Sequence, residues 1–332
     1  MKELRIGLIG CAGRGTLADH ANLPGKARVV AGADRYPEQR QMFLDRYREK
    51  YRTEPAVYTD YREMIDKEQL DGVVIASPDF LHEEHAVYAL EHRVPVYLEK
   101  PIAIAIDSAD RILEAAYAGR TKLVIGHNMR YMAFVRKMKE IIDAGTIGEV
   151  RAVWCRHFVS YGGDAYFRDW HARKAYSNSL LLQKGAHDID VIHFLAGSRT
   201  VRVNGMGNLS VYDKLPRRPA GEERIREGIA SVWKTDHWPP LEQKELYPVI
   251  EVEDVNMINM QLANGVMASY EQCFYTPDTC RNYTVIGSKI TETTRRRATS
   301  RSGPAAPTTS GSKATSPAAS MRRTAHTAAP TR

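Results

Sequence analysis

The chain has 332 residues, of which 43% are hydrophobic and 26% are charged, and its formal net charge is +7 at pH 7. A chain of this size buries roughly 75% of its unfolded surface and usually forms two domains. No apolar run approaches the ~20 residues that a membrane-spanning helix needs, so we expect no membrane partner.

The net charge is confined to the C-terminal segment. Residues 291–332 contain eight Lys or Arg and one Glu, so they carry the whole +7, and the residues before them are neutral. A basic chain is otherwise typical of proteins that bind nucleic acid or anionic membranes. Because the body is neutral, we expect no nucleic-acid partner.

The cysteines and the N-terminus indicate the compartment. Cys11, Cys155, Cys273 and Cys280 form no CxxC pair, which is typical of reduced thiols in a cytoplasmic protein. The first apolar run begins at Leu4, is short and reads as a strand rather than a signal peptide. The sequence therefore predicts a cytoplasmic protein.

The first predicted element is a buried strand over residues 4–10, LRIGLIG, which ends in the glycine that opens the turn GCAGRG. Gly10 permits the tight turn, while Gly13 and Gly15 let the backbone approach a pyrophosphate, which the N-terminus of the following helix favours. The turn departs from the GxGxxG pattern at Ala12, so a purely structural glycine turn is the alternative.

The second predicted strand, residues 27–34, ends at Asp34, which lies 19 residues after Gly15. A carboxylate at this place can accept hydrogen bonds from both ribose hydroxyls, and it would repel the 2′-phosphate of NADP. Asp34 therefore favours NAD as the cofactor. Arg35, the next residue, leaves NADP open.

Two further apolar runs, residues 70–78 and 94–101, read as strands covered on both faces of a doubly wound parallel sheet. Between them, apolar residues at helical spacing predict a helix that carries His82 and His85. Because no third ligand is evident, we expect solvated or capping histidines rather than a metal site.

With Glu99-Lys100-Pro101 after a predicted parallel strand and GLIGCAGRG upstream, the chain resembles a known family, the Gfo/Idh/MocA oxidoreductases, which include glucose–fructose oxidoreductase and inositol dehydrogenase. The resemblance spans about residues 3–288, and its ordered motifs are GLIGCAGRG (7–15), ASPDFLH (76–82), YLEKP (97–101), GHNMRY (126–131), AGTIGEV (144–150) and LLLQKGAHDIDVIHFLAG (180–197). It implies a Rossmann domain, residues 1–125, and an α/β domain, residues 126–289, whose open, largely antiparallel sheet carries the substrate site and often the oligomer interface.

The resemblance implies that Lys100 lies beside the nicotinamide and the substrate. When a hydride leaves a carbinol carbon, the hydroxyl proton needs an acceptor, and a lysine held by a carboxylate, or a histidine, can take it. We expect Pro101 to be cis, which would fix the turn that presents Lys100.

The family's second catalytic element is Asp-x-Gly-x-His-x-x-Asp, which aligns with residues 183–190. His187 and Asp190 match and share one helix face. Gln183 replaces the first Asp, so a carboxylate is missing, and Lys184 places a second cation nearby. We assign Lys100, Lys184, His187 and Asp190 to the catalytic group. We assign the cofactor to Gly10, Ala12, Gly13, Arg14, Gly15, Asp34, Arg35, Ser77, Pro78, His82, Glu99, Lys100 and Asn128.

In the second domain, a strand over residues 149–159 precedes a loop, residues 161–179, rich in Gly and aromatics. Aromatic faces and charged hydrogen-bonding groups commonly hold sugars, so this loop is a candidate substrate wall; the alternative is a loop packed on the sheet by its aromatic rings. The candidate residues are Tyr161, Asp164, Tyr166, Trp170 and His171.

The rest of this domain is predicted to contain a strand at residues 200–212, a hairpin at 255–275 and a strand at 282–288. The Pro-rich segment 213–250 is long enough to suggest a functional role, such as a lid over the site.

Residues 290–332 are rich in Thr, Ala, Ser, Pro and Arg without apolar periodicity, so we expect no further strand and no closing helix. Either this is a disordered low-complexity tail, or the coding frame shifts near residues 289–294. The second reading would leave an open sheet edge and poor stability. Resequencing the gene distinguishes the two.

These features predict an NAD-dependent oxidoreductase that acts on a hydroxyl of a sugar, sugar derivative or cyclitol, with Lys100 and His187 as the acid/base pair. The resemblance also implies a homo-oligomer for intact family members. Two alternatives stay open: a redox-neutral NAD-dependent glycosidase, and a cofactor-binding regulator without catalysis.

Overall fold

The computed structural model describes residues 2–160, 166–222 and 240–289, together with the backbone of 291–297. The chain divides into two compact units. The first unit comprises Met1–His127 and Arg173–Ala186, and the second comprises Asn128–Ala172 and His187–Arg332. The segment Arg173–Ala186 thus packs with the N-terminal unit, although the sequence predicted a continuous second domain from residue 126.

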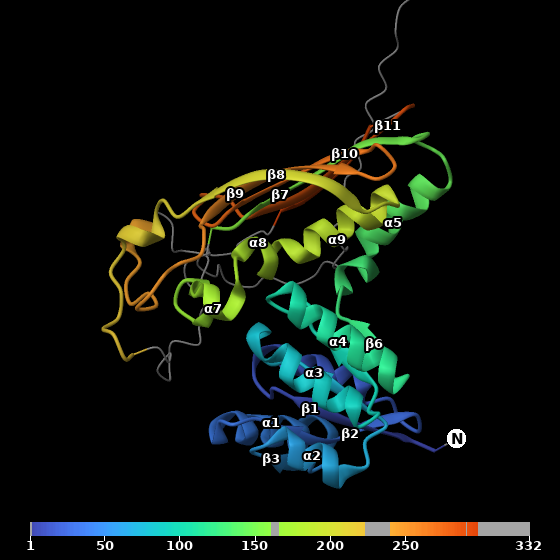
Figure 1. Cartoon of the computed structure of the whole chain (residues 1–332), viewed down its shortest axis with the longest axis vertical. Helices are drawn as coiled ribbons and strands as arrows, with labels where there is room; N and C mark the ends of the chain where they lie inside the picture. The colour runs from blue at the N-terminus through green and yellow to red at the C-terminus, as the bar shows by residue number, and fades with distance from the viewer. Residues whose placement is uncertain (1, 161–165, 223–239, 290, 298–332) are drawn as a thin grey trace, which may run out of the picture. The chain divides into compact units, whose positions relative to one another are not determined.

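The first unit contains a six-stranded sheet of order β3-β2-β1-β4-β5-β6, in which every neighbouring pair is parallel (Figure 1). The strands are β1 Leu4–Ile9, β2 Ala27–Ala33, β3 Ala56–Tyr58, β4 Gly72–Ile75, β5 Val96–Leu98 and β6 Leu123–Ile125. The order reverses between β1 and β4, which is where open α/β sheets bind ligands. The predicted doubly wound Rossmann sheet is confirmed.

Helices cover both faces of this sheet. Leu8 and Val74 belong to one buried cluster and Ile9 and Ile75 to another, and alternate residues of a strand point to opposite faces. The helical elements of this unit, including two that do not belong to those faces, are α1 Pro37–Tyr51, α2 Tyr61–Glu68, α3 His82–Glu91, α4 Ile106–Gly119 and the short α7 Lys174–Ser177 and α8 Leu180–Gln183, with 3-10 helices η1 Gly13–Ala21 and η2 Asp79–Leu81.

The element after the glycine turn is the 3-10 helix η1, Gly13–Ala21, where the pattern predicted an ordinary helix start. Its sequence, GRGTLADHA, contains Gly, Thr, Asp and His, which favour the α-helix less than Ala or Leu do. A phosphate at this turn would therefore meet backbone N–H groups of a tighter helix than expected.

The second unit contains a six-stranded sheet of order β12-β11-β7-β10-β9-β8. Its strands are β7 Val150–Phe158, β8 Thr200–Asn208, β9 Val255–Leu262, β10 Met267–Cys273, β11 Cys280–Gly287 and β12 Thr291–Arg297. Only β7 and β10 pair in parallel among these described strands, so the predicted largely antiparallel sheet is confirmed.

The helical elements that belong wholly or mostly to the second unit are η3 Asn128–Tyr131, α5 Ala133–Asp143, η4 Trp170–Ala172, α9 Gly185–Ala196, η5 Tyr212–Lys214 and η6 Pro240–Glu242. Figure 1 shows α5 and α9 along one face of the sheet. Asp188 on α9 bonds to side chains of β7, β10 and β11, which fixes this helix on the sheet.

Strand β12 contradicts the expectation that no strand follows residue 289. Thr291–Arg297 pairs antiparallel with β11, from Ile286↔Thr291 to Cys280↔Arg297. An open sheet edge offers backbone donors and acceptors to any extended segment, and the β-branched Thr residues suit a strand. Residues 298–332 lie outside the described part of the chain, so the two readings of the tail stay predictions there.

Part of the predicted lid segment is anchored in the second unit. The guanidinium of Arg218 donates to the carbonyl oxygens of Glu222, Glu245 and Arg168 at 2.9, 2.7 and 2.8 Å. Residues 223–239 lie outside the described residues, and the lid stays a prediction. No helix in the described ranges is long and apolar enough to cross a membrane.

Candidate active site

The glycine turn of the first unit requires glycine at two positions, where a Cβ atom would clash with the backbone. Gly10 has φ +88°, and a Cβ there would lie 2.8 Å from the backbone of Ala76. A Cβ on Gly15 would lie 2.4 Å from the carbonyl oxygen of Gly10. A Cβ on Gly13, by contrast, would meet nothing within 4 Å. The turn is thus tight where it meets β4 and open at Gly13, as a phosphate-binding turn requires.

Asp34 joins the end of β2 to this turn. Its Oδ2 accepts from the backbone N–H of Cys11 at 3.0 Å and its Oδ1 from that of Tyr36 at 3.0 Å. Each carboxylate oxygen has a second lone pair, so Asp34 can still accept hydrogen bonds from ribose hydroxyls. Arg35 is exposed, and its guanidinium lies 4.7 Å from the centre of the Tyr36 ring.

These residues fit a nicotinamide dinucleotide. Ala12, Gly13 and Arg14 are exposed at the turn, and Asp34 lies at the carboxyl end of the neighbouring strand. A dinucleotide-binding unit places its pyrophosphate at such a turn and its adenosine ribose at such an acid. The turn and Asp34 would hold the cofactor, which supplies the hydride chemistry when bound.

The histidines that follow β4 are buried, so the expectation of solvated or capping side chains is wrong. The His82 ring nitrogens lie 2.7 Å from the Pro101 carbonyl oxygen and 3.0 Å from that of Ser77. His85 Nδ1 lies 2.9 Å from Ser77 Oγ. Burial lowers the pKa of His82 and lowers that of His85 to about 4. His82 therefore joins the loops after β4 and β5, and its full burial leaves no surface for direct contact with a cofactor.

Glu99 connects the end of β5 to the glycine turn. The carboxylate is buried, and its Oε1 accepts from Arg14 Nη2 at 2.8 Å while its Oε2 accepts from the backbone N–H of Lys100 at 3.1 Å. A buried carboxylate with both oxygens bonded in this way is a rigid support. Arg14 and Glu99 thus fix the turn relative to Lys100. Pro78, another predicted cofactor residue, directly precedes η2 on the loop after β4.

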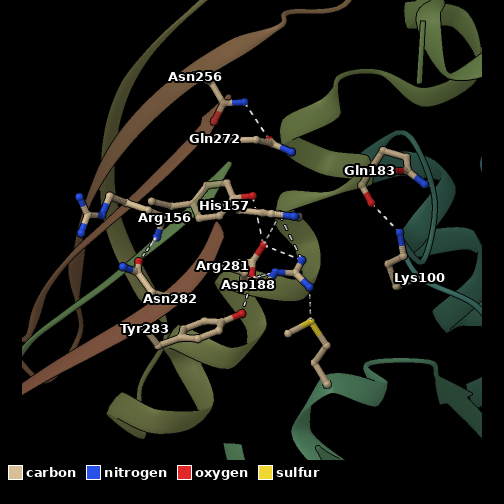
Figure 2. A network of polar contacts seen from close by, with 12 residues as sticks. Lys100, Arg156, His157, Gln183, Asp188, Asn256, Gln272, Arg281, Asn282 and Tyr283 are labelled. Atoms are coloured by element: carbon tan, nitrogen blue, oxygen red, sulfur yellow. Dashed lines mark hydrogen bonds and ion pairs between the residues drawn. The ribbon is translucent and has the colours of Figure 1, made fainter. Parts of the chain in front are cut away.

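Lys100 lies at the carboxyl end of β5, and the Lys100–Pro101 peptide is cis, as expected. Lys100 Nζ donates to the carbonyl oxygen of Gln183 at 2.6 Å (Figure 2). Burial lowers the pKa of Lys100 to about 8; the charge of Asp79 opposes this shift and that of Lys184 adds to it. A lysine that titrates this close to neutral pH can both accept and donate a proton.

Gln183 occupies the position of the absent carboxylate and contacts Lys100 through its backbone. Its side chain is buried, and within the described residues its Oε1 has no hydrogen-bond partner. Lys184, at the end of α8, acts on Lys100 as a like charge. The structure therefore brings Lys100, Gln183 and Lys184 together within the first unit.

His187 and Asp190 belong to the second unit, on α9. The Asp190 carboxylate forms a two-point ion pair with the guanidinium of Arg130 in η3, with Arg130 Nε donating to Oδ2 at 2.7 Å. Asn128 is the first residue of the same 3-10 helix. Asp190 thus anchors η3, a role that the sequence did not suggest, and the pairing of His187 with Lys100 stays a prediction.

Asp188 on α9 is a fully buried acid of the second unit, and it was not among the predicted site residues. Arg281 and His157 contact its carboxylate, and the hydroxyls of Tyr270 and Tyr283 donate to it (Figure 2). Burial alone would raise the pKa of Asp188, but the Arg281 and His157 charges hold it well below its usual range. An acid among the apolar residues of GAHDIDVIHFLA could have indicated a buried carboxylate. Its partners could not be predicted, because they lie 31 to 95 residues away in the chain.

The predicted substrate wall is only partly described, because Tyr161 and Asp164 lie outside the described residues. Tyr166 is buried, and its ring packs edge-on against Phe274 at a centroid distance of 5.0 Å. The rings of Trp170 and His171 stack at 3.8 Å and are partly exposed. Trp170 and His171 remain candidates for substrate contact, whereas Tyr166 packs in the interior of the unit. Within the described residues no group of three or more His, Cys, Asp or Glu is placed to hold a metal ion.

Comparison with known proteins matches both units to one family. Residues 4–127 match the model of an oxidoreductase family with an NAD-binding Rossmann fold, and residues 135–291 match the GFO/IDH/MocA C-terminal domain. The chain is 33% identical over 200 residues to inositol 2-dehydrogenase of Burkholderia multivorans (strain ATCC 17616 / 249), which covers 58% of this chain and 55% of that protein.

Two further relatives are similar over longer stretches. The protein YteT of Bacillus subtilis (strain 168) is 28% identical over 261 residues, covering 69% of this chain and 61% of YteT. The solved structure of a levoglucosan dehydrogenase in complex with NADH is 21% identical, with a TM-score of 0.71, and covers 89% of this chain and 73% of that one. The chain thus spans 55% of the length of the inositol 2-dehydrogenase and 61% of that of YteT.

The two domain matches follow one another along the chain and cover the first sheet and all of the second except β12, in the order that the resemblance implied. The chain therefore belongs to the Gfo/Idh/MocA family of oxidoreductases.

Proposed function

We propose that the protein is a nicotinamide-dependent dehydrogenase that oxidises a hydroxyl group of a sugar, sugar derivative or cyclitol. The observation that carries this proposal is Lys100, a partly buried lysine at the carboxyl end of β5 with a pKa of about 8. Inositol 2-dehydrogenase among the sequence relatives and levoglucosan dehydrogenase among the structural ones support the substrate class.

In this proposal Lys100 is the acid/base group. As the hydride leaves the carbinol carbon for the nicotinamide ring, the neutral amine of Lys100 accepts the hydroxyl proton. The hydrogen bond from Lys100 Nζ to the Gln183 carbonyl oxygen orients the amine, and Glu99 holds its backbone. His187 is the second proposed acid/base group and Lys184 the neighbouring cation.

We further propose NAD rather than NADP as the preferred cofactor. Asp34 keeps its carboxylate at the end of β2, with both oxygens accepting backbone N–H groups. A 2′-phosphate at this place would meet a negative charge, whereas a ribose hydroxyl can donate to it. Ala12, Gly13 and Arg14 would line the pyrophosphate.

The test is turnover of a panel of cyclitols and sugars by the purified protein with NAD or NADP, followed by the absorbance of the reduced cofactor. We expect net formation of NADH with at least one substrate. Lys100→Met should lower kcat/KM by about 100-fold or more, while Lys122→Met, on an exposed lysine of the same unit, should leave it unchanged.

Two results would contradict this proposal. Cleavage of a glycoside without net NADH would indicate a redox-neutral glycosidase. Binding of NAD without turnover of any panel member would indicate a cofactor-binding regulator.

A further inference from the structure

Asp79 and Lys100 arise from the same edge of the first sheet. Asp79 begins η2, four residues after the end of β4, and Lys100 follows the end of β5 by two residues. These strands are parallel neighbours with Ile75 paired to Leu98, so their carboxyl ends meet. The imidazole of His82 joins the two loops through the carbonyl oxygens of Ser77 and Pro101, which keeps both loops in place.

The Asp79 side chain is buried but incompletely bonded. It is 5% exposed, and in the described part of the chain its Oδ2 has no hydrogen-bond partner. A buried carboxylate oxygen without a partner is unfavourable, and such groups are rare unless they have a functional role. Glu99 differs, since Arg14 and the Lys100 backbone occupy both of its oxygens. Of these two carboxylates, Asp79 is therefore the one with an oxygen that can accept a further hydrogen bond.

Charged groups from four elements act on the Lys100 ammonium. Asp79 in η2 and Glu99 after β5 favour the charged lysine, and Lys184 at the end of α8 and Arg14 in η1 oppose it. The buried imidazole of His82 also interacts with it. Among these groups Asp79 exerts the largest effect after burial itself, while Glu99 is already paired with Arg14.

The titration of the two groups agrees with their placement. Burial raises the pKa of Asp79 to about 7; the Glu99 charge adds to the shift and Lys100 opposes it. Burial lowers the pKa of Lys100 to about 8. Each side chain thus changes charge near neutral pH, and the charge of each one shifts the pKa of the other.

We propose that Asp79 is the positioning residue that stabilises the protonated form of Lys100, supplying from η2 the carboxylate that is absent at Gln183. This inference rests on the proposed function, in which the substrate hydroxyl gives its proton to the neutral Lys100 amine and the carbinol carbon gives a hydride to the nicotinamide. The negative charge of the Asp79 carboxylate then stabilises the ammonium so formed. No bond to Asp79 changes, and in the reverse direction the ammonium returns the proton to the alkoxide oxygen.

The test measures the titration of Lys100 without any substrate. The full-length protein is labelled with trace acetic anhydride across a pH series, and the labelled fraction of Lys100 is read by mass spectrometry. Asp79→Asn should move the midpoint of Lys100 labelling to lower pH by about one unit, because the stabilising charge is lost. Asp79→Glu should restore most of the difference, and Asp45→Asn, on an exposed acid of α1, should leave the midpoint unchanged.

A midpoint in Asp79→Asn equal to that of the wild type overturns the inference. Circular dichroism and thermal melting check that each variant is folded. Should Asp79→Asn not fold, Asp79→Ser carries the same expectation with a smaller side chain. Lys184→Met should move the midpoint in the opposite direction, to higher pH, because it removes a like charge.

Failure of the inference and failure of the proposed function give different results. If Asp79→Asn moves the labelling midpoint but no sugar or cyclitol is oxidised, the control of Lys100 by Asp79 stands and the dehydrogenase proposal fails. If a substrate is oxidised, the limb of the kcat/KM profile that reports Lys100 should move to lower pH in Asp79→Asn by the same amount as the labelling midpoint. If Asp79→Asn oxidises the substrate at the full rate and changes neither the kcat/KM limb nor the Lys100 labelling midpoint, the dehydrogenase proposal stands and the role of Asp79 is contradicted.

Discussion

Arg281 and Asp188 form a buried two-point ion pair between β11 and α9. Arg281 Nε lies 2.9 Å from Asp188 Oδ1, and Arg281 Nη2 donates to Oδ2 at 3.0 Å (Figure 2). His157, Tyr270 and Tyr283 complete the shell around the carboxylate. Because Asp188 lies in the first turn of α9, next to His187, this pair fixes the helix segment that carries the second predicted acid/base residue.

We expect Asp188→Asn to destabilise the protein by about 3–5 kcal/mol, because it leaves the Arg281 guanidinium buried without its counter-charge. Denaturant unfolding monitored by circular dichroism measures the loss. Asp143→Asn, on an acid of α5 that is 59% exposed and pairs with Lys139, is the control and should change stability by less than about 0.5 kcal/mol. Equal losses in both variants would contradict the role of the buried pair.

The stability of the protein should fall in acid. The pKa of Asp188 in the folded state lies well below its ordinary value of 3.8, so the unfolded chain binds a proton there first. The stabilisation is complete above about pH 4 and is lost as the pH falls toward the folded pKa. Unfolding free energies between about pH 6 and pH 2 should show this slope in the wild type and a shallower one in Asp188→Asn. Parallel profiles would contradict the assignment.

Asp34→Ser should weaken NAD binding by about tenfold, since it removes charge-assisted acceptors for ribose hydroxyls. Binding of NADP should weaken less or improve, because the charge that repels the 2′-phosphate is gone and Arg35 remains beside it. Titration calorimetry with each cofactor measures the ratio. Asp45→Asn serves as the control, and an unchanged NAD to NADP ratio in Asp34→Ser would contradict the assignment of Asp34.

The outward face of the second sheet carries exposed methionines. Met206, Met257 and Met267 are 83%, 56% and 53% exposed, and Met206 pairs with Met257 across β8 and β9. We propose that this face joins copies of the chain, as the family resemblance implies. Met206→Glu should then lower the average mass in solution measured by light scattering, while Met42→Glu, on exposed α1, should not. A wild-type protein that is already monomeric would contradict the proposal.

The first sheet followed from the sequence because its signals are local. Strands such as Leu4–Ile9 and Ala27–Ala33 read as apolar runs, and Gly10 and Asp34 directly follow them. The cis Pro101 and the largely antiparallel second sheet followed from the resemblance. The burial of His82 and His85 did not, because a polar residue on a helix reveals its burial only when the facing carbonyl oxygens are known.

By itself the sequence determined the family, the parallel sheet with its glycine turn, and the lysine expected beside the cofactor, since each depends on residues close together in the chain. Only the tertiary structure decided which charges act on Lys100 and which acid of α9 is buried. Gln183 contacts Lys100 and Asp79 acts on its charge from separate segments of the chain, and Arg281 lies 93 residues from Asp188. The physical reason is that pKa values and ion pairs depend on distance in space and on burial, which sequence separation does not reveal.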